Sequence, residues 1–271
     1  MTAPRRPPRP QVTLEVVRTT ALSPGMVRVT LGGDGFAAFT DREETDKYVK
    51  LHIPPAESTL TPPYDLAELR GRLPFDELPS VRTYTVRRVD HSLRTLDIDI
   101  VTHGDTGVAG RWAASARPGE LLTFAGPGGG YRPDVTADHR LFVGDESALP
   151  AIAASLEALP PGVGAVAIVE TRSSAHRIPL AASADLTWVD EDHGAPGSRL
   201  VDAVAGAPWP SGRVQVFAHG EREAMKRLRA VFAERGVARQ DLSLSAYWAY
   251  GRSEDTFQAE KRLPVGQIFP D

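Results

Sequence analysis

The sequence predicts two domains: a six-stranded antiparallel β-barrel, then an α/β domain with a doubly wound parallel sheet. Up to about residue 127, short strands alternate apolar and polar residues between turn residues, which is typical of a barrel. Beyond residue 130, short apolar strands alternate with amphipathic helices, as in a parallel sheet covered on both faces. The 271 residues suffice for two cores. We expect a disordered tail over 1–10, the barrel over 11–127 and the α/β domain over 128–271.

The barrel strands are expected near residues 12–16, 27–31, 49–53, 82–89, 96–100 and 121–124. Between Pro54 and Pro79 lie six prolines without sustained periodicity, which indicates a long surface loop or lid. One helical stretch, 107–114, begins with small residues, and the backbone N–H groups at such a helix start can approach an anion. The alternative is a plain barrel-capping helix with Thr106 as its N-cap.

The α/β domain is expected to contain strands near residues 141–143, 165–169, 186–189, 214–217 and 242–248. Helices are expected after Gly144–Ser147 through Leu159, near 200–204, and over 221–235. A last helix, with Ser253 as N-cap, is expected to run to about Arg262. In such sheets ligands bind beyond the carboxyl ends of the strands.

The amino-acid composition excludes several kinds of reactive group and cofactor site. The chain is 41% hydrophobic and 24% charged with a net charge of −4, so nothing global argues for a nucleic-acid partner. Cysteine is absent, which excludes disulfides, thiolate-bound iron–sulfur clusters and a cysteine nucleophile, so redox chemistry would need a bound organic cofactor. No secretion signal and no apolar run long enough for a membrane helix occurs, so we expect a cytoplasmic chain without membrane contact. The oligomeric state is left open, with a monomer as the expectation.

Residues 82–87 read R-T-Y-T-V-R and place an arginine, a ring and two hydroxyls on one strand. The period of two sends Arg82, Tyr84 and Val86 to one face and Thr83, Thr85 and Arg87 to the other. Such a strand can present a flat ring and a charge to a planar, phosphorylated ligand. An ordinary amphipathic strand with a solvated arginine explains the same six residues equally well.

Two segments of the α/β half follow expected strands and are nucleotide-site candidates. Gly144, Asp145, Glu146 and Ser147 lack the G-x-G-x-x-G fingerprint, so phosphates would meet Ser147 and helix backbone. An acidic first turn that complements the helix dipole is the alternative for the two carboxylates. Arg172, in the loop 171–177, is placed where a 2′-phosphate of NADPH would lie, although a solvated loop is the simpler explanation and NADH stays open.

No catalytic side chain and no metal site is predicted. The seven histidines show neither H-x-x-x-H nor H-E-x-x-H spacing, and the G-x-S-x-G elbow is missing. Chemistry that needs no protein acid, base or metal ligand, such as electron transfer through a cofactor, is consistent with this.

Four motifs in order resemble the siderophore-interacting proteins, FAD-dependent ferric-siderophore reductases of the ferredoxin–NADP reductase superfamily. The motifs are 82–87 (RTYTVR), 101–104 with 107–112 (VTHG and GVAGRW), 144–152 (GDESALPAI) and the Tyr247-Trp248 pair. The resemblance implies that Tyr84 stacks on the isoalloxazine, that Thr85 hydrogen-bonds its edge and that Arg82 meets the diphosphate. The other residues that it assigns to cofactors are Thr83, Val101, His103, Gly107, Val108, Ala109, Gly110, Arg111 and Trp112 for FAD, with Gly144–Ser147 and Arg172 left for NAD(P)H.

The resemblance also implies basic residues that hold an anionic ferric siderophore. Lys50 matches one such position, and Arg252 or Lys261 replace a cation that members of the family often have after the Tyr-Trp pair, with Trp248 beside them. For each of Lys50, Arg252 and Lys261, a solvated surface position without a ligand explains the sequence equally well. The implied reaction passes electrons from NADPH or NADH through FAD to siderophore-bound Fe(III). A flavin or ferredoxin reductase with another acceptor, and a flavin-binding sensor without turnover, stay open.

Overall fold

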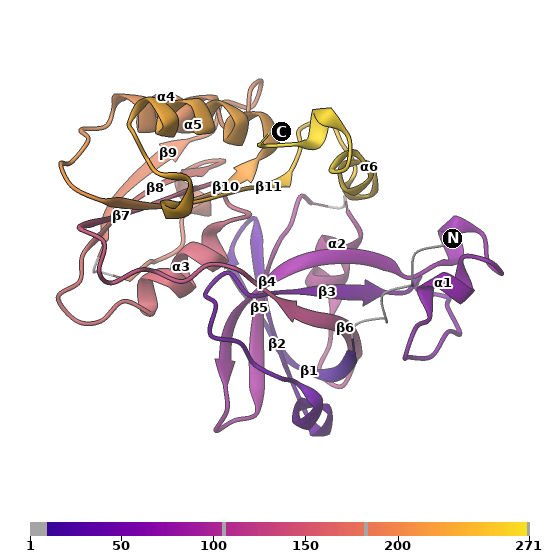
Figure 1. Cartoon of the computed structure of the whole chain (residues 1–271). Helices are drawn as coiled ribbons and strands as arrows, with labels where there is room; N and C mark the ends of the chain where they lie inside the picture. Colours follow the sequence, from indigo (N-terminus) through magenta and orange to yellow (C-terminus); the bar gives the residue numbers. More distant parts are fainter. Residues whose placement is uncertain (1–9, 105–106, 182–183, 270–271) are drawn as a thin grey trace, which may run out of the picture. The chain divides into compact units, whose positions relative to one another are not determined.

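The computed structural model describes residues 10–104, 107–181 and 184–269, which form two compact units (Figure 1). Unit 1 holds the chain up to Ala21, Met26–Glu43 and Lys47–Gly129. Unit 2 holds Leu22–Gly25, Glu44–Asp46 and the chain from Gly130 onward. Residues 1–9 of the expected tail, and Thr106, the alternative N-cap, lie outside the described residues.

Unit 1 is a closed barrel of six strands, as predicted. The strands are β1 (Gln11–Ser23), β2 (Met26–Gly32), β3 (Tyr48–Ile53), β4 (Ser80–Asp90), β5 (Thr95–Val101) and β6 (Leu121–Gly128). Their order around the barrel is β1-β2-β5-β4-β3-β6. The alternating pattern sends apolar side chains inward, where Leu51, Ile98 and Phe124 are completely buried. Closure leaves the sheet without exposed edges and fixes the neighbours of β4.

Short helices complete unit 1. They are α1 (Leu66–Leu69), α2 (Val108–Ser115) and the 3₁₀ turns η1 (Asp34–Ala38) and η2 (Phe75–Glu77). The segment 54–79 therefore contains α1 and η2, where the sequence indicated a loop. Gln11 fastens it to β1, because the Gln11 side-chain amide donates to the Tyr64 carbonyl and accepts from the Tyr64 N–H, each at 2.8 Å.

Unit 2 is built on a five-stranded parallel sheet, again as predicted. Its strands are β7 (His139–Gly144), β8 (Ala165–Thr171), β9 (Ala184–Asp190), β10 (Val214–Glu221) and β11 (Leu242–Trp248), in the order β11-β10-β7-β8-β9. The helices are α3 (Leu149–Glu157), α4 (Ser198–Gly206), α5 (Arg222–Glu234) and α6 (Glu254–Glu260), with 3₁₀ turns η3 (Ser174–His176), η4 (Arg239–Asp241) and η5 (Pro264–Gly266). Figure 1 shows α4 and α5 on one face of the sheet and α3 on the other.

The helix boundaries follow local capping. Ser253 caps α6 as predicted, since its hydroxyl accepts from the Thr256 N–H at 3.2 Å, but the helix ends at Glu260 rather than near 262. Helix α3 starts only at Leu149, because the residues from Asp145 to Ala148 form a turn. No helix among the described residues is both long enough and apolar enough to cross a membrane.

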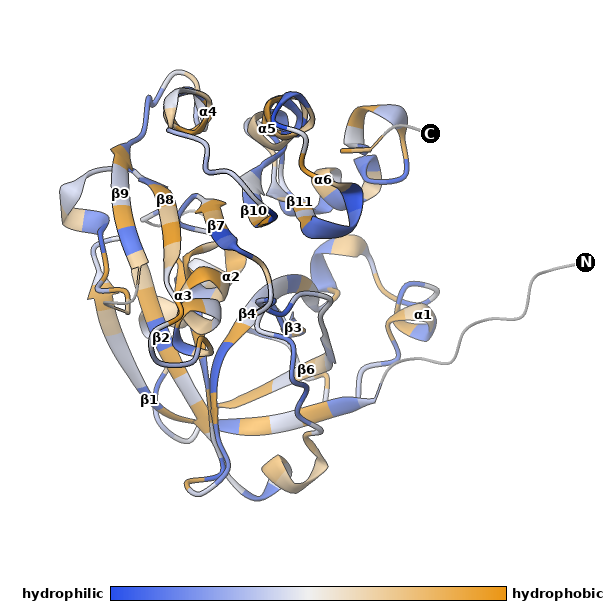
Figure 2. Cartoon of the chain, turned by 60° about the vertical axis from the view of Figure 1, so that its left-hand side comes forward, coloured by the Kyte–Doolittle hydropathy of each residue, from blue (hydrophilic) through white to orange (hydrophobic). Residues whose placement is uncertain are grey.

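The sheet of unit 2 has a buried centre and an exposed edge. Strand β8 is largely hydrophobic and buried, whereas β9 alternates hydrophobic and hydrophilic residues as an edge strand does (Figure 2). The chain lays down β7, β8 and β9 in one direction and then returns to place β10 and β11 on the other side of β7. The switch point of the sheet, where ligands of doubly wound folds bind, is therefore between β7 and β10.

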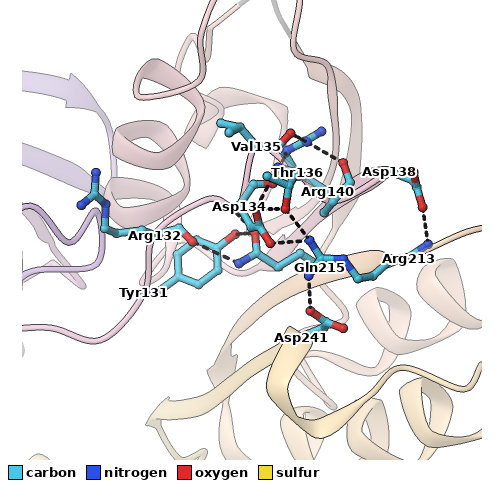
Figure 3. Close-up of polar contacts among 11 residues, drawn as sticks. Tyr131, Arg132, Asp134, Val135, Thr136, Asp138, Arg140, Arg213, Gln215 and Asp241 are labelled. Atoms are coloured by element: carbon cyan, nitrogen blue, oxygen red, sulfur yellow. Dashed lines mark hydrogen bonds and ion pairs between the residues drawn. The ribbon is translucent and has the colours of Figure 1, made fainter.

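A polar network fixes the segment 131–137, which leads into β7. Arg213, just before β10, forms ion pairs with Asp134 and with Asp241, the latter at 2.9 Å (Figure 3). The Gln215 side chain accepts from the Asp134 N–H at 2.7 Å and from the Tyr131 hydroxyl at 3.1 Å. Hydrogen bonds from Thr136, together with the pairing with Arg213, lower the pKa of Asp134 to about 2. The network holds β7 and β10 side by side and so defines the switch point.

Candidate functional site

Strand β4 changes partner in the middle of the R-T-Y-T-V-R motif. It pairs with β3 over Ser80–Thr85 and with β5 only from Val86 onward. The pairing with β5 starts at Val86 opposite Ile98, so the segment 82–85 lies just before the β4–β5 ladder. The motif was visible in the sequence, whereas this change of partner depends on strand register.

The side chains of the motif alternate as predicted. Tyr84 packs against the barrel core and lies opposite Val49 of β3, while Thr83 is exposed and lies opposite Lys50. Thr85 is buried, at 6% exposure. Arg82 is half-buried and donates from Nη1 to the Val81 carbonyl at 2.9 Å. The strand offers a fixed ring, a guanidinium and a hydroxyl within four residues.

Helix α2 begins at a glycine, and among the described residues no side chain caps its first turn. The N-cap is Gly107, with φ of +78°, and an added Cβ there would meet nothing within 4 Å. A glycine has no side chain to accept the N–H groups of the first turn, which no intrahelical carbonyl satisfies. Those groups, from Val108 to Gly110, suit an anion, and the helix dipole adds to the attraction. Trp112 and Val108 pack against the barrel core and hold the helix in place.

The same helix lies against the end of β5. A Cβ on Gly110 would be 3.4 Å from both the Val101 carbonyl oxygen and the Thr102 Cα, and Ala109 is buried. Because β5 runs antiparallel to β4 and continues past Ile98, the residue opposite Val86, its end extends toward the segment 82–85. The R-T-Y-T segment of β4 and the first turn of α2 therefore lie at the same end of β5. His103 follows it and is exposed, as is Arg111, whose Nε donates to the Gly107 carbonyl at 3.2 Å.

Lys50 is the only predicted substrate residue in unit 1. It is exposed on β3, and it is paired with Thr83, so both side chains project from the same face of the barrel. This face adjoins the R-T-Y-T-V-R strand directly. The other predicted substrate residues, Trp248, Arg252 and Lys261, belong to unit 2.

In unit 2 the Asp145 carboxylate ties the strand ends at the switch point together. It accepts hydrogen bonds from the Ser147 N–H at 2.9 Å and hydroxyl at 2.5 Å, from the Glu221 N–H at 2.9 Å and from the Trp248 indole Nε1 at 2.7 Å. Burial raises the pKa of Asp145. The N–H of Ser147, expected to meet a phosphate, is thus engaged internally here, and Pro150 in the first turn of α3 has no N–H to offer. A nucleotide contact at Gly144–Ser147 stays a prediction.

The neighbouring Glu146 pairs with Arg172. Arg172 donates from Nη2 and Nε to Glu146 Oε2 at 2.8 and 3.0 Å, and its backbone N–H donates to Oε1 at 2.8 Å. The acidic residues therefore do not act as a first helical turn, which was the alternative considered for them; they tie strand ends together. Contact of Arg172 with a dinucleotide is likewise still a prediction.

Two further carboxylates at strand ends have structural roles that the sequence did not indicate. Glu170 of β8, 1% exposed, accepts from the Gly197 N–H at 2.7 Å and the Leu200 N–H at 3.2 Å and so caps α4. Burial raises the pKa of Glu170 to about 7. Glu221 caps α5, accepting from the Glu223 N–H at 2.6 Å. The signal in each case is a carboxylate as the last or next-to-last residue of a strand.

The C-terminal cations have partners inside unit 2. Arg252 Nε lies 2.8 Å from Glu260, which also pairs with the buried Arg222 at 2.5 Å. Lys261 Nζ lies 4.5 Å from the centre of the Phe257 ring. The two arginines and Glu260 together leave one positive charge. Among the described residues no group of three or more histidine, aspartate or glutamate side chains is arranged to hold a metal ion.

Both units match models of known protein families. Residues 15–131 match the family model described as Siderophore-interacting FAD-binding domain, and residues 137–251 match the one described as Siderophore-interacting protein. An uncharacterized protein of Mycobacterium tuberculosis is 43% identical over 271 aligned residues, which cover 94% of this chain and 95% of that protein. The NADPH-dependent ferric-chelate reductase of Escherichia coli is 31% identical, over 87% of this chain and 91% of that one. The crystal structure of a siderophore utilization protein from T. fusca is 37% identical with a TM-score of 0.77, and the match covers 92% and 96% of the two chains.

Proposed function

The chain belongs to the siderophore-interacting protein family, as its motifs predicted, and we propose that it is an FAD-dependent ferric-siderophore reductase. In this proposal electrons pass from NAD(P)H through the flavin to siderophore-bound Fe(III), and Fe(II) is released. Fe(III) is the harder ion and holds oxygen ligands more tightly, so reduction weakens the complex. The name of the Escherichia coli relative supports a reductase of ferric chelates with NADPH as donor.

One observation carries the proposal: the segment Arg82–Thr85 and the first turn of α2, whose N-cap is a glycine, lie at the same end of β5. A ligand that fits both must have a flat part for Tyr84 and an anionic part for the helix start, which describes a flavin dinucleotide. When bound, FAD links a two-electron donor to a one-electron acceptor. The described residues fit the group: Arg82 offers a charged donor to the diphosphate, and the N–H groups of the first turn of α2 complete its seat.

The chain's own part in the reaction is binding and orientation. Tyr84 is held against the barrel core, and its ring would stack on the flavin, while the hydroxyl of Thr85 would hydrogen-bond the flavin edge. Lys50 supports a substrate role because it projects from the neighbouring strand, where it would attract an anionic ferric complex toward the flavin. No proton has to be moved by a side chain, which agrees with the absence of any predicted catalytic acid or base.

The reaction is tested by steady-state oxidation of NADPH and NADH, with Fe(II) trapped by a chromogenic chelator. The proposal expects oxidation that accelerates when hydroxamate or catecholate ferric siderophores are added, together with Fe(II) release. Slow rates with every ferric chelate, combined with fast rates on ferredoxin or free flavin, would show a reductase with another acceptor. An FAD-loaded protein that turns over none of these would be a sensor and would also refute the proposal.

The flavin seat is tested by a matched pair of glycine variants. Gly107 and Gly119 both have positive φ, +78° and +89°, and open space around an added Cβ, so Gly→Ala strains the backbone at either position, by about 1–3 kcal/mol. Only Gly107 lies at the proposed phosphate seat. We expect Gly107→Ala to weaken FAD binding and Gly119→Ala to leave it unchanged, as measured by equilibrium dialysis. Equal losses in both variants would remove Gly107 from the site.

A second pair tests the stacking role. Tyr84→Phe keeps the ring and should retain FAD, whereas Tyr84→Ala removes it and should lower FAD affinity by about tenfold, corresponding to about 1–1.5 kcal/mol of ring contact. Full FAD occupancy in Tyr84→Ala would undo the assignment.

A further inference from the structure

We infer that unit 2 does not favour the 2′-phosphate of NADPH over the plain ribose of NADH, and that Glu146 is the residue responsible. This inference rests on the proposed function, since it concerns the dinucleotide that supplies the electrons. The Escherichia coli relative, by contrast, is named as an NADPH-dependent reductase.

The argument begins with the position of Arg172. In doubly wound sheets the adenosine ribose lies near the carboxyl end of the strand beside the first one, where an arginine can accept the 2′-phosphate. Here that strand is β8, which ends at Thr171, and Arg172 follows directly. It is the residue from which selectivity for NADPH would be expected.

The charge of Arg172 is already neutralised. Glu146 meets both Nη2 and Nε of the guanidinium, with oxygen distances of 2.8 and 3.0 Å, and also accepts the Arg172 backbone N–H at 2.8 Å. The two side chains are 24% and 10% exposed, so little water screens the pair. A bidentate, charge-assisted pair of this kind is among the stronger polar contacts of a protein.

The Arg172 Nη2 that pairs with Glu146 has a second neighbour. Arg172 Nη2 lies against the turn at Gly25, which clusters with unit 2, and donates to the Gly25 carbonyl at 3.5 Å. A Cβ on Gly25 would come within 1.9 Å of that nitrogen. Arg172 is therefore held between Glu146 and this turn and is not poised to move toward a ligand.

Two other polar side chains of the loop have partners, although the buried Arg177 Nε has no hydrogen-bond partner among the described residues. The Ser173 hydroxyl lies 3.0 Å from His176 Nδ1, and Arg177 donates to Asp190 at 2.8 Å while its guanidinium lies 5.9 Å from the Trp188 ring centre. A 2′-phosphate placed here would meet paired cations and the Glu146 carboxylate. To take Arg172 it would have to displace Glu146 and leave a mostly buried carboxylate unpaired beside a second anion, which is costly. A ribose hydroxyl imposes no such cost.

The test compares the binding of NADP⁺ and NAD⁺ to the full-length, FAD-loaded protein by isothermal titration calorimetry, a readout independent of turnover. We expect the natural protein to bind NAD⁺ at least as tightly as NADP⁺. Glu146→Gln keeps the shape of the side chain but removes the charge, so it should shift the ratio of the two Kd values toward NADP⁺ by about tenfold. Glu234→Gln, an exposed position near the end of α5, makes the same change in net charge and should leave the ratio unchanged.

Arg172→Ala in the Glu146→Gln background provides a second measurement. If the shift toward NADP⁺ in Glu146→Gln comes from the released Arg172, adding Arg172→Ala should return the NADP⁺ to NAD⁺ ratio to that of the natural protein; a ratio that stays shifted would overturn the inference. A natural protein that binds NADP⁺ more than about tenfold tighter than NAD⁺ would also overturn it. Failure of both dinucleotides to bind would refute the proposed nicotinamide donor and this inference with it, whereas a wrong ratio refutes the inference alone.

Discussion

Replacing Glu170 by glutamine should make unit 2 less sensitive to rising pH. Glu170 is 1% exposed on β8, where its carboxylate accepts two backbone N–H groups at the start of α4, from Gly197 and Leu200. Two effects oppose one another at this position. Burial favours the protonated acid, whereas the two N–H donors favour the ionised form, and burial prevails: the pKa of Glu170 rises from 4.5 to about 7.

The direction and size of this pH effect on stability follow from the linkage between proton binding and folding. As pH rises, the unfolded chain releases this proton near 4.5 while the folded chain keeps it until about 7, so the folded state binds more protons in between. Stability contributed by the protonated carboxyl is therefore complete below 4.5 and is lost as pH approaches 7. The difference of about 2.5 pH units corresponds to about 3 kcal/mol. Glutamine does not titrate, so Glu170→Gln should gain roughly that much relative to the natural protein between pH 5 and pH 8.

The assay is urea unfolding of both proteins at steps between pH 5 and pH 8, followed by circular dichroism, with carbon-13 NMR of the Glu170 carboxyl as a direct titration. Glu234→Gln, on an exposed surface, serves as the control for net charge and should run parallel to the natural protein. If the free energy of unfolding of Glu170→Gln also changes with pH in parallel with that of the natural protein, within about 0.5 kcal/mol, then the Glu170 carboxylate is ionised throughout this pH range. In that case the two N–H donors outweigh burial.

Three other outcomes are expected. Gly110→Ser should raise stability by about 0.5–1 kcal/mol, because the Cβ meets its neighbours at an ordinary 3.4 Å, and should tighten FAD binding more than Gly110→Ala, as thermal melts and dialysis would show. Asp99→Ala should cost about 2–4 kcal/mol in urea unfolding, since this buried carboxylate accepts from Arg28 at 2.6 and 2.8 Å; a loss below about 1 kcal/mol would contradict it. Burial lowers the pKa of His219 from 6.5 to about 3, so the natural protein loses stability as pH falls below 6.5, by up to roughly 5 kcal/mol. His219→Phe, which can keep the stack on Phe217, should abolish that loss.

The fold could be predicted because its signals are local. Alternation over six short segments is enough for a barrel, and the change of pattern near Gly126 marks where parallel strands begin. The capping role of Ser253 was readable for the same reason, since a hydroxyl and the N–H three residues later are neighbours in sequence. Helix ends were less accurate, because α3 is delayed to Leu149 by a turn built around Asp145, whose partners come from distant strands.

The candidate site could be predicted only in part. The residues of the R-T-Y-T-V-R strand were visible in the sequence, but the residue at which β4 begins to pair with β5 depends on strand register, which the sequence does not show. The pairing of Glu146 with Arg172 joins residues 26 positions apart, and that of Asp145 with Trp248 joins residues 103 apart. Sequence patterns place each of these side chains at a strand end without showing which of them meet.

The two units present their polar groups in opposite ways, and this suits the roles proposed for them. At the strand ends of unit 2, Asp145, Glu170 and Glu221 already accept backbone N–H groups, so a dinucleotide there would compete with internal hydrogen bonds and bind weakly. In unit 1, Gly107 leaves the start of α2 open, so an anion gains new hydrogen bonds without breaking others. A cofactor that is retained through many turnovers needs a site like that of unit 1, where binding adds hydrogen bonds. A donor that must leave after each hydride transfer is better served by a site like that of unit 2, where binding competes with internal hydrogen bonds.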